Sequence, residues 1–254
     1  MTYQPTYGDF VWFDLMTTDL PASIAFYTEL IPQWSVTRRT PVPGYGYHVI
    51  DVDGRPTAGM VAMDAGGPPP HWISYVGVPD CEASTARAQA LGAEVPVPCF
   101  HLPGVGRMAV LADPEGAYIK PLQWDTPPTP FDSREPGRFS WCELLSRDTE
   151  AAAAFYPELF GWTAQKIPMG PQPYLLWRLN DKEIGGAMPM PPDAQAPAAW
   201  LPYLTVTDVD DTAARATAGG GSICKPPADI PDVGRLAVLA DPTGARFAVF
   251  RSAH

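Results

Sequence analysis

The sequence predicts an α+β fold of four β-α-β-β-β modules arranged as two tandem repeats. The first observation is that residues recur at a nearly constant offset over about 100 positions, which indicates two homologous halves. The matched pairs, 129 or 128 positions apart, are Trp12 with Trp141, Asp19 with Asp148, Phe26-Tyr27 with Phe155-Tyr156, and Asp80 with Asp208. The second observation is that each half repeats the order of strand, aspartate and helix, so that each half divides into two modules.

The first module begins with the strand-like run "FVWFDLMTTD", and Asp19 is suited to cap the helix that follows. Apolar residues from Leu20 to Leu30 fall on one face of that helix, as an amphipathic helix requires. We then expect three strands, at 35–39, 45–52 and 57–63. Asp53-Gly54 predicts a tight hairpin turn between the last two.

The second module repeats this order with a helix after Asp80 that ends before Gly92, because glycine is favoured just past a helix end. Its three strands are expected at 94–98, 106–113 and 117–124. The second half should follow the same plan, with helices beginning near Asp148 and Asp208. We expect one repeat over residues 8–125, a Pro-rich linker over 126–136 and a second repeat over 137–252.

Composition excludes several classes of function. A net charge of −11 argues against nucleic acid or an anionic membrane surface as the main partner, since both attract cationic proteins. No apolar run approaches the length of about 20 residues that spans a bilayer. The first residues lack the basic start and apolar core of a secretory signal. We therefore expect a cytoplasmic protein, monomeric or homodimeric, whose partner is a small molecule.

The four modules, the "LFGW" after the third helix and the paired "GR-x-AVLADP-x-GA" motifs resemble the vicinal oxygen chelate superfamily over nearly the whole chain. This group includes glyoxalase I, bleomycin-resistance proteins and extradiol dioxygenases. The resemblance implies cups of curved sheet, each able to cover a small molecule. Whether the cups form within or between the repeats stays open at this point.

The resemblance also implies three metal-ligand positions in each half. Here they are occupied by residues that are poor ligands for a divalent ion. These residues are Trp12, Ser74 and Lys120 in the first half, and Trp141, Pro202 and Ala248 in the second. We therefore expect no metal and no cofactor. The alternative is a displaced site, because Asp14 and Glu143 lie two residues after each tryptophan and thus on the same strand face.

The candidate ligand-binding residues follow from these positions. They are Trp12, Asp14, His48, Ser74, Lys120, Trp141 and Glu143. An indole offers a stacking wall for an aromatic ligand, although either tryptophan can instead fill the core. Trp72 and Trp200 could likewise contact a ligand or fill the core, and for these two residues a role in packing is favoured. Lys120 can bind an anion or pair with a carboxylate such as Asp14. His48 breaks the symmetry, because its counterpart is Leu175.

Two functions are compatible with this pattern. The first is a metal-independent protein that binds or sequesters a hydrophobic or aromatic metabolite or antibiotic. The alternative is an enzyme of the same fold, of the lyase, isomerase or hydroxylase/dioxygenase type, that acts on a small metabolite in secondary metabolism or detoxification. Lys120, His48 and Asp14 are its candidate acid–base groups. Fold alone does not decide between them.

Overall fold

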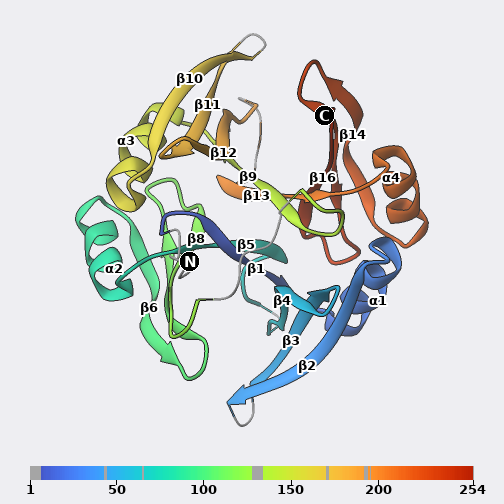
Figure 1. Ribbon diagram of the computed structural model, residues 1–254, viewed down its shortest axis with the longest axis horizontal. Coiled ribbons are helices and arrows are strands. Elements are labelled where there is room, and N and C mark those ends of the chain that lie inside the picture. The colour runs from blue at the N-terminus through green and yellow to red at the C-terminus, as the bar shows by residue number, and fades with distance from the viewer. Residues whose placement is uncertain are drawn as a thin grey trace, which may run out of the picture. The chain divides into compact units, whose positions relative to one another are not determined.

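The computed structural model describes residues 7–42, 45–64, 66–127, 134–169, 172–191, 194 and 196–253. Within these ranges the chain forms four helices and two eight-stranded sheets, which confirms the α+β fold and its four β-α-β-β-β modules (Figure 1). The strand order is β2-β3-β4-β1-β5-β8-β7-β6 in one sheet and β10-β11-β12-β9-β13-β16-β15-β14 in the other.

The elements of the first half follow the predicted order. The first module comprises β1 (Phe10–Thr17), α1 (Leu20–Leu30), β2 (Trp34–Val42), β3 (Tyr45–Val52) and β4 (Arg55–Ala62). The second comprises β5 (His71–Gly77), α2 (Cys81–Ala90), β6 (Glu94–Leu102), β7 (Gly106–Ala112) and β8 (Tyr118–Trp124).

The second half repeats this arrangement. Its first module comprises β9 (Phe139–Ser146), α3 (Thr149–Phe160), β10 (Thr163–Met169), β11 (Gln172–Leu179) and β12 (Lys182–Pro189). Its second comprises β13 (Ala199–Thr205), α4 (Val209–Ala218), β14 (Ser222–Ile230), β15 (Gly234–Ala240) and β16 (Arg246–Ser252). The domain boundaries at 125 and 137 stay a prediction, and residues 128–133 of the expected linker lie outside the described residues.

All four helices begin where the aspartates predict. The side chains of Asp19, Asp80, Asp148 and Asp208 each accept a hydrogen bond from a backbone N–H in the first turn, at 2.9–3.1 Å. Such caps satisfy donors that have no partner inside the helix. Gly92 adopts φ +95° just after α2, the left-handed conformation that the sequence predicted at this helix end.

The described chain divides into two compact units, and each unit takes one module from each half. One unit consists of the described residues within 7–11, 73–127 and 141–200, and the other of those within 12–72, 134–140 and 201–253. In the first unit α2 packs against α3, and in the second α1 packs against α4 (Figure 1). The repeat in the sequence is therefore not the unit of packing.

Each unit is held together by a buried tyrosine from one half and an aspartate from the other. The hydroxyl of Tyr156 on α3 donates to Asp113 Oδ2 at 2.7 Å, and it accepts a hydrogen bond from Trp200 Nε1 at 2.9 Å. In the other unit, Trp72 Nε1 donates to the hydroxyl of Tyr27 at 2.9 Å. Burial, followed by the charge of Asp241, raises the pKa of Tyr27 well above its ordinary value.

Trp72 and Trp200 are therefore part of the packing core. Each is only 4% exposed, and each ring meets its tyrosine edge-on with centroids 5.5 and 5.1 Å apart. Aromatic pairs prefer this geometry because the ring edge is positive and the face negative. The expectation that these two tryptophans serve packing is consistent with their burial.

No helix in the described part of the chain is both long and apolar enough to cross a bilayer.

Candidate functional site

Trp12, Asp14 and Tyr47 form a hydrogen-bonded cluster on one face of the β1–β4 sheet. Trp12 Nε1 donates to Asp14 Oδ1 at 2.9 Å and to the Tyr47 hydroxyl at 2.8 Å. The Tyr47 hydroxyl donates to the same carboxylate oxygen at 2.6 Å. Asp14 is 3% exposed, so its carboxyl group is buried and needs hydrogen-bond partners, whereas the rings of Trp12 and Tyr47 stay partly exposed.

The second half contains the same cluster with a glutamate in place of the aspartate. Trp141 Nε1 lies 3.0 Å from the Tyr174 hydroxyl, which donates to Glu143 Oε2 at 3.0 Å. Burial, and then the charge of Glu143, raise the pKa of Tyr174 above its ordinary value, so the hydroxyl keeps its proton and remains a donor. The cluster thus occurs once in each compact unit.

A glycine on the neighbouring strand gives each tyrosine its space. Gly59 on β4 pairs with Asp14, and Gly186 on β12 pairs with Glu143. A Cβ atom at either glycine would lie 1.9 Å from the tyrosine hydroxyl oxygen, far inside van der Waals contact. Only glycine therefore permits the hydroxyl to reach the carboxylate across the strand.

Replacing Gly59 with alanine should displace the Tyr47 ring and lower the free energy of unfolding by about 1–3 kcal/mol, because buried Asp14 loses a hydrogen-bond donor. Urea denaturation measures the loss. Gly67→Ala is the control, since its Cβ would lie 3.6 Å from the nearest atom, an ordinary contact. Equal free energies of unfolding in the two variants would show that the Tyr47 ring can move aside without destabilising the fold.

Lys120 and Ser74 lie in the unit that holds Trp141, not in the one that holds Trp12. Lys120 Nζ donates to the Tyr75 hydroxyl at 2.8 Å and lies 4.6 Å from the centre of the same ring. Ser74 is fully buried, with its Oγ 3.1 Å from Cys142 Sγ. Ser74 therefore has no accessible surface for a ligand in this conformation.

His48 lies on the opposite face of β3 from Tyr47, because successive strand residues alternate. Its face carries Ile50 and Val52, which are buried. Its Nδ1 is buried and has no hydrogen-bond partner among the described residues. Burial, followed by the nearby charge of Arg38, lowers the pKa of His48, so the imidazole is neutral at pH 7. The structure does not bring His48 into the Trp12 cluster.

The positions that the resemblance assigns to metal ligands do not fit a divalent cation. The N–H groups of Trp12 and Trp141 are directed at other side chains, and the ammonium of Lys120 donates to Tyr75. Pro202 and Ala248 have no side-chain donor atom for a metal. Within the described ranges, no group of three or more His, Cys, Asp and Glu side chains could hold a metal ion.

The four repeated β-α-β-β-β modules and the strand order of their two sheets define a glyoxalase-like protein, and sequence comparison agrees. The family described as "Glyoxalase/Bleomycin resistance protein/Dioxygenase superfamily" matches residues 138–249, and the "Glyoxalase-like domain" matches residues 10–120. The chain belongs to this superfamily.

Two groups of relatives match almost the full chain. "Putative glyoxylase CFP32" of Mycobacterium tuberculosis is 39% identical over 95% of this chain and 94% of its own length. "Anthracycline biosynthesis protein DnrV" of Streptomyces peucetius is 31% identical over 94% and 91%.

Solved structures share the fold at low identity. The Mn(II)-bound glyoxalase from Novosphingobium aromaticivorans has a TM-score of 0.65 at 15% identity, covering 96% of this chain and 82% of that one. The 2,3-dioxygenase LapB from Pseudomonas sp. KL28 has a TM-score of 0.66 at 15% identity, covering 98% and 94%. At such identity the likeness concerns the fold alone.

Sequence reasoning missed Tyr47 and Tyr174, which complete the two clusters. The signal was present, because His48 and Leu175 match across the repeat and each follows a tyrosine. Aligning every polar residue of the two halves, rather than the metal positions alone, would have found both.

Proposed function

We propose that this protein binds a planar aromatic small molecule against its Trp-Tyr-carboxylate clusters, without a metal ion. The observation that carries the proposal is the recurrence of the cluster in both halves, at the strand position where the family resemblance places a metal ligand. The core residues Trp72 and Trp200 also recur, but they are only 4% exposed, whereas Trp12 and Trp141 stay partly exposed and can contact a ligand.

The geometry of the clusters supports a stacking role. The Trp12 indole is fixed by two hydrogen bonds to groups of its own unit, so a ligand gains contact area at little cost in side-chain entropy. Because the N–H is already used, the partly exposed ring offers a ligand aromatic contact rather than a hydrogen bond. Aromatic contact favours flat, conjugated ligands.

The relatives named for anthracycline biosynthesis narrow the ligand class. Anthracyclines are built on a hydroxylated anthraquinone, a planar ring system with polar oxygens at its edges. A half-exposed indole and phenol suit the flat faces of such a molecule. We therefore infer a polycyclic aromatic ligand of this type, either held for sequestration or positioned for conversion.

Titration with a hydroxylated anthraquinone, followed by tryptophan fluorescence and calorimetry, tests the proposal. Trp12→Ala should weaken binding at its unit by about 10-fold, equivalent to about 1.4 kcal/mol, while the variant stays folded. Phe100→Ala controls for adhesion to exposed rings, because Phe100 is 43% exposed and lies on the edge strand β6. Unchanged affinity in both Trp12→Ala and Trp141→Ala would overturn the assignment.

Catalysis is the second candidate, and the Lys120–Tyr75 pair favours it. An ammonium group 2.8 Å from a phenol hydroxyl can hold or donate a proton beside a bound substrate. Relatives named as glyoxylases also point towards turnover. Mass analysis of the anthraquinone after incubation distinguishes the two functions: an unaltered probe supports binding, whereas a product that disappears in Lys120→Met supports catalysis.

A further inference from the structure

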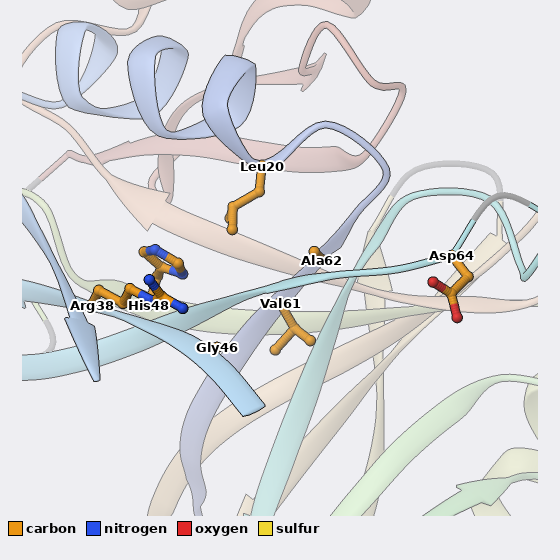
Figure 2. Close-up of a pocket in the computed structure, with 7 residues that line it drawn as sticks. All are labelled: Leu20, Arg38, Gly46, His48, Val61, Ala62 and Asp64. Carbon is orange, nitrogen blue, oxygen red and sulfur yellow. The ribbon is translucent and has the colours of Figure 1, made fainter. Parts of the chain in front are cut away.

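An open groove lies beside the first module, on the opposite face of β3 from Tyr47. It has a volume of about 590 Å³, within the range of small-molecule sites (Figure 2). Arg38, Gly46 and His48 line it from β2 and β3, and Leu20 lines it from the first turn of α1. Ala62 adds an apolar side chain, and Asp64 marks the far end from His48 (Figure 2).

Two side chains of this groove lack the partners that such groups normally have. The Nδ1 atom of His48 is buried without a hydrogen bond, and buried polar atoms in native proteins are rarely left so. Arg38 stands directly opposite His48 in the β2–β3 pairing, and within the described residues it forms no ion pair. Figure 2 shows the imidazole and the guanidinium together below Leu20.

The second repeat differs from the first at the positions equivalent to His48 and Arg38. There Leu175 replaces His48, and its strand partner is Lys166. The Lys166 ammonium is paired with Glu150 in the first turn of α3. In the first repeat, the first turn of α1 has no acidic residue, so Arg38 has no equivalent of Glu150. In the second repeat the cation Lys166 is therefore paired with an acid, whereas in the first repeat Arg38 and His48 line an open groove.

We propose that this groove is a second binding site, which takes a small aromatic or aliphatic monocarboxylate. The guanidinium of Arg38 holds the carboxylate beside the imidazole of His48, which lines the groove, and Leu20 and Ala62 contact the apolar body. Arginine suits this role because its planar fork matches a carboxylate. A single negative charge fits better than two, since the groove also contains Asp64 and the chain carries a net charge of −11.

Calorimetric titration of the whole protein with cyclohexanecarboxylate tests the site, because this probe lacks the flat aromatic face that the Trp clusters are proposed to bind. Arg38→Gln and His48→Leu, the latter copying the second repeat, should each weaken binding at least 10-fold. Arg39→Gln is the matched control: it removes a neighbouring exposed cation that instead lies 4.0 Å from Asp51, and should leave the affinity unchanged. Circular dichroism confirms that the variants fold.

Two further titrations test whether the groove selects a carboxylate. Neutral cyclohexanecarboxamide should bind at least 10-fold more weakly than cyclohexanecarboxylate, and cyclohexyl phosphate should also bind more weakly. Failure of cyclohexanecarboxylate to bind, unchanged affinity in the Arg38 and His48 variants, or preference for the amide or the phosphate would overturn the proposal.

Discussion

Truncation of Trp72 or Trp200 to alanine should lower the free energy of unfolding by about 3–5 kcal/mol, the cost of removing a buried aromatic side chain. Each indole is 4% exposed and donates its N–H to a fully buried tyrosine hydroxyl. The substitution thus creates a cavity and also removes a hydrogen bond in the middle of a unit. Urea denaturation at neutral pH measures the effect.

Trp12→Ala provides the comparison, because its ring is only half-buried and is fixed at the sheet face. We expect it to cost less than half as much as Trp72→Ala. Trp72→Phe separates cavity from hydrogen bond, since it keeps an aromatic ring and loses the N–H. If Trp12→Ala proves as destabilising as Trp72→Ala and no ligand binding changes, Trp12 belongs to the close-packed core.

Stability should fall steeply above about pH 10, because three tyrosines titrate much later in the folded chain than in the unfolded one. Burial raises the pKa of Tyr27, Tyr156 and Tyr174, and the neighbouring carboxylates Asp241, Asp113 and Glu143 raise them further. A raised folded-state pKa contributes stability that is complete below the unfolded pKa and is lost as the pH rises beyond it.

Each tyrosine that keeps its proton while the unfolded chain releases one lowers the free energy of unfolding by up to about 1.4 kcal/mol per pH unit, so the three together lower it by up to about 4 kcal/mol per pH unit. Urea denaturation at a series of pH values gives the slope, and phenolate absorbance reports ionisation. Tyr156→Phe should reduce the slope by about one third. Ionisation of all ten tyrosines near pH 10 in a chain that remains folded would contradict the burial of these hydroxyls.

The fold was predictable because its signals are local. An aspartate cap fixes the start of each helix through hydrogen bonds within one turn, and Gly92 marks a helix end through its own backbone. The same order of strand, aspartate and helix recurs in all four modules, so each weak signal supports the others. The pairing of modules across the halves was not predictable, because the contact of Tyr156 with Asp113 joins elements that no local pattern relates.

The candidate site was predictable in part. Trp12 and Asp14 share a strand, so alternation correctly placed them on one face, and the same holds for Trp141 and Glu143. We expected His48 beside this cluster, but it lies on the opposite face of β3. Strand alternation accounts for this, because the adjacent Tyr47 occupies the cluster face. The partner of Lys120 required tertiary structure, since Tyr75 lies 45 residues away on another strand.

The exchange of modules between the halves makes each half incomplete by itself. The first half contains Tyr27 but not Asp241, and Asp113 but not Tyr156. Separate subunits of this kind would have to meet in solution before either core could close, and their folding would depend on concentration. Joining them in one chain makes the encounter intramolecular, with an effective concentration set by the connecting segment. The fused protein can therefore complete both cores however dilute it is.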